Sequence, residues 1–243
     1  YLIENRRYPE IWTQGMRVPI PKCGDRLDVN NYRGITVLSA MTKVFEVAVN
    51  KRFVFLKEVT NTEDKNNGGF IKGSRTSDNM FILKGIIERQ MILRQSLYIC
   101  FVDFSKAFDI INRYILFYKL LKSNIHGRVI DTVRDLYSKT EFKVKTSDGY
   151  STSIRDMVGV NQGGNLSPTL FREYLSDLSE YLEYNYGIVI GNEILCHLLW
   201  ADDLILLSDS PDGLQTQLEG LELFCSNNHM IINETKTKIM VYG

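Results

Sequence analysis

The segment Leu-Leu-Trp-Ala-Asp-Asp-Leu-Ile-Leu-Leu, residues 198–207, places two short apolar runs on either side of a pair of adjacent acids. Apolar runs of this kind favour strands, and the small-acid-acid step between them is typical of a tight turn, so we expect a β-hairpin. Asp202 and Asp203 would then stand where two buried strands meet, and an ionised carboxylate loses hydration there. One explanation is that aspartate is a common turn residue. The other is that the two carboxylates bind a divalent cation.

The size and composition of the chain permit a substantial folded core. It has 243 residues, of which 44% are hydrophobic, enough for one large domain or two closely packed subdomains. Its 29 Lys and Arg residues balance 29 Asp and Glu residues, so the formal net charge is zero. This balance neither favours nor excludes nucleic acid as a partner, because charges of one sign can still gather on one face.

The cysteines and histidines are scattered and have neither disulfide nor zinc-site spacing. They are Cys23, Cys100, Cys196 and Cys225, with His126, His197 and His229. We expect reduced, buried thiols in an intracellular protein, and histidines with structural roles. No apolar run approaches the length of a membrane span, and no signal peptide is visible. The start at Tyr1 and the strand-like end before Gly243 indicate a piece of something longer.

The rest of the sequence alternates helical and strand-like patterns without repeats. Helices are expected over residues 40–56, 79–93, 113–122, 128–138, 167–184 and 213–227, and strands over 16–21, 97–102 and 238–242, with two more around a turn at 147–149. The apolar sides of the first two helices are expected at Val44, Val47, Ala48 and Phe55, and at Phe81, Ile82, Ile86 and Leu93. The simplest interpretation is one compact unit.

The clearest buried strand of the first half, Leu97–Val102, runs directly into Asp103. If this strand neighbours the acid-bearing hairpin in one sheet, Asp103, Asp202 and Asp203 converge at one edge. Three carboxylates that close repel one another strongly, and cations would neutralise them. Mg²⁺ prefers such oxygen ligands, and two ions about 3.5–4 Å apart are a known arrangement for displacement at phosphorus.

Six segments, in the correct order along nearly the whole chain, resemble the motifs of reverse transcriptases, most closely those of non-LTR (LINE-type) retrotransposons. They are Val18–Lys22 with Asn31–Ile35 and then Gly69–Gly73 for two fingers motifs, Leu97–Asp109 for motif A, Gly159–Phe171 for motif B, Trp200–Asp203 for motif C and Asn233–Lys238 for motif D. Each motif alone is weak, and the ordered set is specific.

The resemblance implies an α+β right-hand polymerase with fingers and palm, in which an antiparallel palm sheet is backed by helices. Residues 1–96 would be mainly fingers and 97–243 mainly palm, with a fingers-type insertion at about 140–165. The thumb is expected to be absent, because the sequence stops after motif D, and primer–template binding by this fragment is then expected to be weak.

The implied activity is that of an RNA-directed DNA polymerase serving retrotransposition, with two Mg²⁺ ions as cofactors and Mn²⁺ as a possible replacement. The implied partners are an RNA template, a DNA primer and a dNTP, together with thumb and endonuclease domains of the same polyprotein, and no membrane. The implied location is intracellular and nuclear.

The resemblance also gives roles to the acids and to aromatic residues near them. Asp103, Asp202 and Asp203 would hold the metals, with the backbone carbonyl of Phe104 as a further ligand. Phe108 would lie under the nucleotide sugar, where its ring would clash with a ribose 2′-OH. A core position is the alternative for Phe108.

The remaining implied roles fall on cations, a loop and an aromatic ring. Lys22 and Arg33 would hold the triphosphate, with solvated loop charges as the alternative. Gln162 and Gly163 would pack under the nucleotide and the templating base. Lys236 would protonate the pyrophosphate leaving group, with a plain surface lysine as the alternative. The last of these residues, Trp200, would offer a flat face to the primer terminus.

The sequence departs from the family pattern at four positions. Trp200 stands where Tyr or Phe is usual, Asn161 replaces a frequent Arg, Gly164 a frequent Cys, and Asn67 a common Gln. The alternatives to the main hypothesis are a non-catalytic, RNA-binding scaffold of the same fold and a reverse transcriptase of the group II intron or telomerase type. A two-metal nuclease is a third alternative, but no further acid-rich motif or catalytic histidine accompanies the acids.

Overall fold

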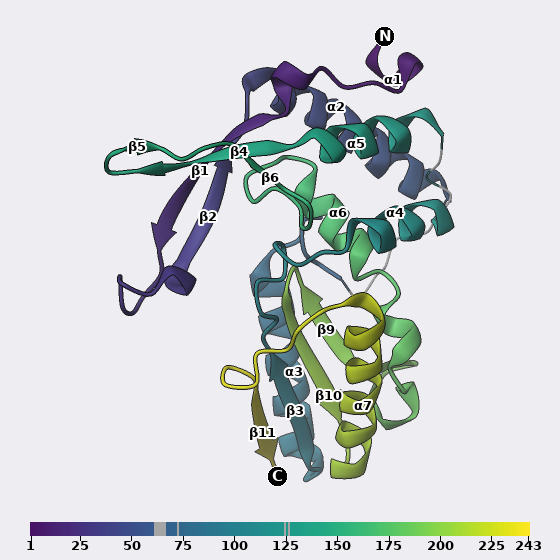
Figure 1. Cartoon of the computed structure of the whole chain (residues 1–243). Helices are drawn as coiled ribbons and strands as arrows, with labels where there is room; N and C mark the ends of the chain where they lie inside the picture. Colours follow the sequence, from purple (N-terminus) through teal and green to yellow (C-terminus); the bar gives the residue numbers. More distant parts are fainter. Residues whose placement is uncertain (61–66, 72, 124, 126) are drawn as a thin grey trace. The chain divides into compact units, whose positions relative to one another are not determined.

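The computed structural model describes residues 1–60, 67–71, 73–123, 125 and 127–243 (Figure 1). The described chain forms two compact units rather than the single unit expected, and each unit is built from two separate stretches. Unit 1 lies within residues 1–63 and 111–173, and unit 2 within 64–110 and 174–243. The chain therefore leaves one unit and returns to it. The expected boundaries of fingers and palm stay a prediction.

Unit 1 combines helices with a mixed sheet. Its helices are α1 (Leu2–Asn5), α2 (Ala40–Thr60), α4 (Arg113–Lys122), α5 (Arg128–Lys139) and most of α6 (Ser167–Tyr174), and its strands are β1 (Gln14–Pro21), β2 (Tyr32–Val37), β4 (Glu141–Thr146), β5 (Gly149–Tyr150) and β6 (Ile154–Arg155). The sheet order is β2-β1-β4-β5, with β6 also paired to β4. β1 pairs antiparallel with β2 and parallel with β4, so the segment expected as an insertion shares a sheet with the first strands.

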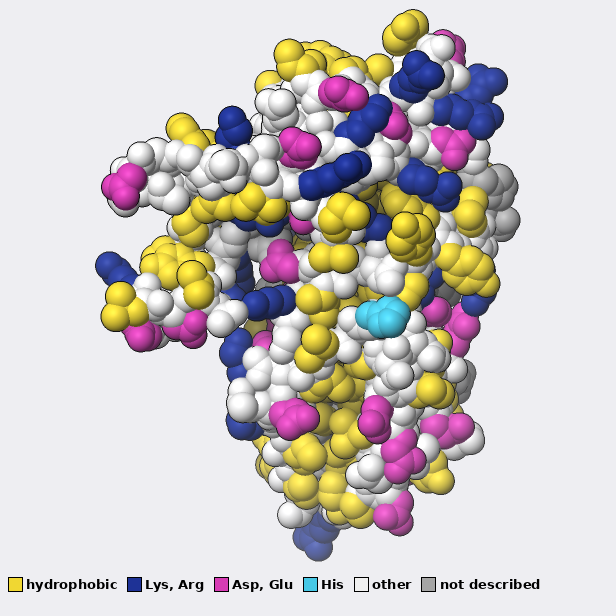
Figure 2. Space-filling model, viewed as in Figure 1, with side chains coloured by type: hydrophobic (Ala, Val, Ile, Leu, Met, Phe, Trp, Pro, Cys, Tyr) yellow, Lys and Arg dark blue, Asp and Glu magenta, His cyan; other side chains and the backbone are white. Residues whose placement is uncertain are grey.

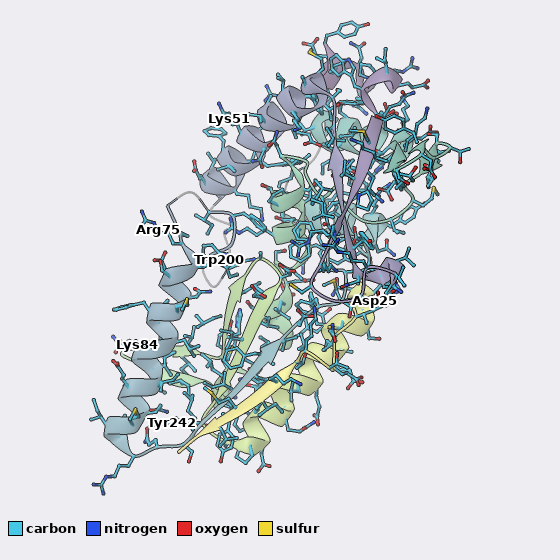
Figure 3. The ribbon with its side chains drawn as sticks, turned by 90° about the vertical axis from the view of Figure 1, so that its left-hand side faces the viewer. Asp25, Lys51, Arg75, Lys84, Trp200 and Tyr242 are labelled. Atoms are coloured by element: carbon cyan, nitrogen blue, oxygen red, sulfur yellow. The ribbon has the colours of Figure 1, made fainter. Side chains whose placement is uncertain are left out.

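Unit 2 is an antiparallel sheet between two long helices. Its elements are α3 (Thr76–Leu93), β3 (Leu97–Val102), β7 (Ile188–Ile190), β8 (Glu193–Leu195), β9 (His197–Trp200), β10 (Asp203–Ser208), α7 (Pro211–Asn228) and β11 (Lys238–Tyr242). The main sheet has the order β11-β3-β10-β9, and β7 pairs with β8 in a separate ribbon. Figure 3 shows α3 and α7 on opposite sides of this sheet.

The alternation of side chains along β3 explains why both helices are needed. Leu97 and Ile99 point to the face where Ile86 of α3 packs, in a buried cluster that also contains Leu207. On the other face Cys100 and Val102 are also buried and Tyr98 is partly buried, as expected for a central strand covered on both sides. The amide of Gln217 on α7 donates to the carbonyl of Leu207, which fixes that helix to β10.

The charges on α7 are of one sign. Asp212, Glu219 and Glu222 lie on this helix, which contains no Lys or Arg. Figure 2 shows acidic side chains over α7 on the visible face. A net charge of zero therefore conceals local segregation of charge. No helix of the described residues is long and apolar enough to cross a membrane.

The apolar side expected for α2 is wrong. Val44, Val47, Ala48 and Phe55 are exposed, and the buried stripe consists of Thr42, Phe45, Glu46, Val49 and Phe53. Two of these buried residues are polar, and each finds a partner far away in the sequence. The Thr42 hydroxyl donates to the carbonyl of Trp12, and the Glu46 carboxylate accepts from the amide of Asn165. Hydrophobic spacing alone cannot identify a face that is buried through such hydrogen bonds.

The expected apolar side of α3 is correct only at Ile86. Phe81, Ile82 and Leu93 are exposed, whereas Leu83 and Ile87 pack against the sheet cluster. Apolar residues lie around most of this helix, so the sequence pattern does not select one side.

The cysteines and the helix expected over residues 167–184 differ in part from the sequence predictions. Cys23 is exposed, so the expectation of four buried thiols is wrong there, while the other three cysteines are buried. The helix expected over residues 167–184 ends at Tyr174 and is followed by two 3₁₀ turns. His126 and Lys72 lie outside the described residues.

Candidate active site

The strand register brings the predicted acids to one edge of the unit 2 sheet. β10 pairs antiparallel with β3, and the last pair is Leu204 with Val102. One further step in the same register sets Asp203 opposite Asp103. Directly opposite residues of an antiparallel pair point to the same face, so these two side chains share it.

Asp202 reaches the same edge through the hairpin turn. β9 and β10 are closed by the pair Trp200–Asp203, which leaves Ala201 and Asp202 as a two-residue loop. Ala201 has a φ of 55°, in the left-handed region that residues with a Cβ seldom enter. In Figure 3 the labelled Trp200 stands at one end of the sheet and Tyr242 at the other.

The three carboxylates influence one another electrostatically. The pKa of Asp203 is raised above its ordinary value, first by partial burial and then by the charges of Asp202 and Asp103. Mutual repulsion of this kind disfavours the ionised form of Asp203, and a nearby cation would favour it. The strand register thus brings the predicted acids to one edge of the sheet, while their role in holding metal stays a prediction.

The donor chemistry at this edge fits a hard divalent cation, since ionised carboxylates are its preferred ligands. Among the described residues, no three His, Cys, Asp or Glu side chains are drawn together into a ready coordination shell. The acids are thus adjacent in register at this edge.

The turn between α7 and β11 packs beside Asp103. The amide of Asn233 donates to the Asp103 carbonyl at 2.7 Å, and the Asp103 amide donates to the hydroxyl of Thr237 at 3.3 Å. Lys236 in the same turn places its ammonium 3.7 Å from the Asp103 carboxylate, with 65% of its side chain exposed. Lys236 therefore lies beside one of the predicted catalytic acids, and its role in protonating the leaving group stays a prediction.

Two phenylalanines follow Asp103. Phe104 is buried and forms an isolated antiparallel bridge with Ile232. The two hydrogen bonds of this bridge use the Asp103 carbonyl and the Ser105 amide, and so do not use the carbonyl of Phe104. Phe108 is half-buried rather than a core residue, and its ring meets that of Phe70 edge to face.

The segment Asn67–Phe70 was not predicted to touch the hairpin. Gly68 donates its amide to the carbonyl of Leu199 at 3.1 Å, and the Asn79 side-chain amide donates to the same carbonyl at 3.3 Å. A Cβ on Gly69 would lie only 2.3 Å from the backbone nitrogen of Ala201. The sequence signal was the consecutive glycines, which permit such close backbone approach.

The predicted triphosphate cations lie in unit 1. Arg33 pairs with Ile20 near the loop that closes the β1–β2 hairpin, and the amide of Lys22 donates to the carbonyl of Asn31. Both side chains are exposed. Asp25, labelled in Figure 3, marks the loop that joins these strands.

The predicted nucleotide loop also belongs to unit 1. The carbonyl of Gln162 accepts from the Thr36 amide at 2.7 Å, so this loop extends the edge of β2. Gly163 has a φ of 115°, and a Cβ there would lie 2.6 Å from the carbonyl oxygen of Thr36. A side chain at Gly163 would therefore collide with the backbone of β2, and the predicted place of this loop under the nucleotide stays a prediction.

Comparison with known proteins gives the family. Residues 20–242 match the sequence model of the family described as "Reverse transcriptase (RNA-dependent DNA polymerase)". The chain belongs to the reverse transcriptase family. Because the match covers nearly the whole chain, it spans both units and all the predicted site residues.

The relatives of this reverse transcriptase domain are mobile elements. It is 27% identical over 216 residues to the Pol polyprotein of the type-1 retrotransposable element R2 of Nasonia vitripennis, covering 88% of this chain and 20% of the relative. It is 26% identical over 237 residues to the RNA-directed DNA polymerase from mobile element jockey of Drosophila melanogaster, covering 94% and 25%. The predicted non-LTR, LINE-type reverse transcriptase domain is confirmed. The chain spans a fifth to a third of the length of these and the Popillia japonica R2 relative.

Solved structures confirm the fold of the reverse transcriptase domain. An apo telomerase from Candida tropicalis superposes with a TM-score of 0.70 at 15% identity, covering 96% of this chain and 51% of that one. Telomerase from Candida albicans in complex with a telomeric RNA fragment gives 0.68 at 12% identity, covering 96% and 43%. The α+β polymerase fold with fingers and palm is thus established.

Two departures of this reverse transcriptase domain from the family pattern have local explanations. A Cβ on Gly68 would lie 3.1 Å from the Trp200 ring, so a glycine there accommodates the bulkier aromatic residue. A Cβ on Gly164 would lie 3.0 Å from a carboxylate oxygen of Glu46, which fills the space of a larger side chain. Burial raises the pKa of Glu46, although the amide of Asn165 donates to its carboxylate.

Proposed function

We propose that this domain is an RNA-directed DNA polymerase that adds dNTPs to a primer 3′-OH on an RNA template, in the service of retrotransposition. The observation that carries the proposal is the meeting of Asp103 with Asp202 and Asp203 at one edge of an antiparallel sheet, in a chain of the reverse transcriptase family. A relative named as an RNA-directed DNA polymerase from a mobile element supports it.

Divalent cations are the cofactors that this donor set suits. Asp103, Asp202, Asp203 and the carbonyl of Phe104 would hold two Mg²⁺ ions, with Mn²⁺ as a replacement. When bound, such ions activate the attacking hydroxyl and stabilise the charge on the leaving oxygen.

The other residues of the domain position the substrates. The Phe108 ring would exclude a ribose 2′-OH and so select deoxynucleotides. Lys236, beside Asp103, would hold the proton that passes to the leaving pyrophosphate. Trp200 would pack against the primer terminus.

Unit 1 would contribute the remaining contacts. Lys22 and Arg33 are exposed cations suited to a triphosphate. The loop at Gln162 and Gly163 would pack under the nucleotide and the templating base. Within the cell, we propose a nuclear location, where an element of this class would meet chromosomal DNA as the primer source, with thumb and endonuclease domains of the same polyprotein as its neighbours.

Single-nucleotide addition tests the proposal. The assay measures dTTP incorporation on poly(rA)/oligo(dT) with Mg²⁺, for the parent chain and for Asp202→Asn. Loss of one metal ligand removes several kcal/mol of transition-state stabilisation, so the rate should fall about 10²-fold or more. Asp209→Asn, which changes an exposed acid just after β10, is the matched control and should incorporate at the parental rate.

Equal incorporation by the parent chain and Asp202→Asn would contradict the proposal. RNA binding by the parent chain without any incorporation would instead favour the non-catalytic scaffold.

A further inference from the structure

The segment Asn67–Phe70 is anchored in unit 2 by buried contacts with β9. Asn67 is 1% exposed and forms a parallel bridge with Leu199. Its side-chain oxygen accepts from the amide of Gly69 at 3.0 Å, which closes a local turn. The segment is therefore held by backbone and side-chain hydrogen bonds on both sides of Gly68.

This anchoring places the backbone of Gly69 directly on the hairpin turn. A Cβ at that position would lie 2.3 Å from the Ala201 nitrogen and 3.0 Å from its Cα. Because the close atoms on both sides are backbone atoms, neither can rotate away. The next residue, Phe70, has a φ of 63°, which a residue with a side chain adopts only when its surroundings impose it.

The ring of Phe70 then meets the ring of Phe108. Their centroids are 6.4 Å apart with an interplanar angle of 89°, an edge-to-face pair. Phe70 is 48% exposed, so the ring that contacts Phe108 is partly solvated and does not belong to the core. The segment thus makes two contacts: Gly69 contacts the acid-bearing turn, and Phe70 contacts Phe108.

We propose that the segment Asn67–Phe70 positions both the hairpin turn and the ring of Phe108. Within this segment, Phe70 determines the discrimination between deoxy- and ribonucleotides. This inference rests on the proposed function, because it assigns the nucleotide sugar to Phe108. Phe70 acts through Phe108 and is a positioning residue, because it is assigned no contact with the substrate.

The physical reason is that steric exclusion requires a ring that cannot turn aside. If Phe108 rotates away, the space for a 2′-OH opens and ribonucleotides enter more readily. Edge-to-face pairing with Phe70 favours one orientation of the ring, and removal of that pairing should weaken discrimination by about threefold to tenfold.

The test compares kcat/KM for dTTP and UTP on poly(rA)/oligo(dT). Phe70→Leu keeps an apolar side chain without a ring, and we expect its dTTP-to-UTP ratio to fall about threefold to tenfold, mainly through a lower KM for UTP. Phe70→Tyr keeps the ring and should restore the parental ratio. Phe81→Leu changes a phenylalanine that is 78% exposed on α3 and should leave the ratio unchanged. An unchanged ratio in Phe70→Leu would overturn the inference.

A second measurement does not depend on activity. With 4-fluorophenylalanine incorporated, the ¹⁹F resonance of Phe108 is assigned as the one that Phe108→Leu lacks. Phe70→Leu should shift this resonance, because the facing ring is gone, whereas Phe81→Leu should not. If the parent chain incorporates no nucleotide, the proposed function fails, and the resonance still decides whether Phe70 positions Phe108. An unshifted resonance would overturn the contact itself.

Discussion

Replacement of Gly69 by alanine should damage the candidate active site more than its small size suggests. The new Cβ would lie 2.3 Å from the backbone nitrogen of Ala201, whereas ordinary contacts begin at 3.4 Å. The hairpin turn or the glycine segment would therefore have to move by about 1.1 Å to restore an ordinary contact. Overpacking of this kind costs about 1–3 kcal/mol of unfolding free energy.

The same displacement should reduce activity, because Asp202 follows Ala201 directly. A shift of about 1 Å in a catalytic group can cost about 10²-fold in rate. Urea unfolding of Gly69→Ala measures the stability loss, and dTTP addition on poly(rA)/oligo(dT) measures the rate. We expect both to fall, with the larger effect on kcat.

Gly85→Ala is the matched control for this prediction. Gly85 lies in α3 of the same unit, and a Cβ there would meet no atom within 4 Å. Alanine is the better helix former by about 1 kcal/mol, so this variant should be as stable as the parent or slightly more so. If Gly69→Ala matches Gly85→Ala in stability and rate, the reasoning from backbone contact is refuted.

Two further predictions concern ionisable groups. Burial raises the pKa of Glu46 above its ordinary value of 4.5, so the folded state favours the protonated form, and the unfolding free energy should fall as pH rises from about 4.5 through the raised folded-state value. Glu46→Gln should remove this fall in urea titrations at several pH values, and a persistent parental slope would contradict the burial of the carboxyl. Cys23 is exposed, and the other three cysteines are buried with raised thiol pKa values, about 11 for Cys196 and about 12 for Cys225. A thiol reagent should therefore modify Cys23 in the folded protein and all four cysteines in denaturant, and rapid reaction of a second thiol in the folded state would count against the packing described.

The sequence predicted the acid-bearing edge because local rules govern it. A continuous apolar run ending in Asp103 and a two-residue turn between apolar runs are strong signals for strands. Pairing of those strands in register then suffices to bring the acids together. The motif order supplied the pairing that the strands alone left open.

The buried faces of the long helices and the role of Gly69 could not be predicted, because they depend on residues far away in the sequence. Thr42 and Glu46 are buried through hydrogen bonds to Trp12 and Asn165, and no spacing rule within α2 reveals those partners. Gly69 is required by the backbone of Ala201, which is more than a hundred residues away in the chain. Such contacts belong to the tertiary structure, and the sequence offers only the glycine itself as a hint.

The most direct measurement is a titration of the chain with Mn²⁺, followed by electron paramagnetic resonance of the free ion. The parent should bind Mn²⁺ with release of protons near the raised pKa of Asp203, because the cation favours the ionised carboxylate. The double variant Asp103→Asn/Asp203→Asn should lose this binding, while Asp209→Asn should keep it. Equal Mn²⁺ affinity in the parent and the double variant would contradict a shared cation site at these acids.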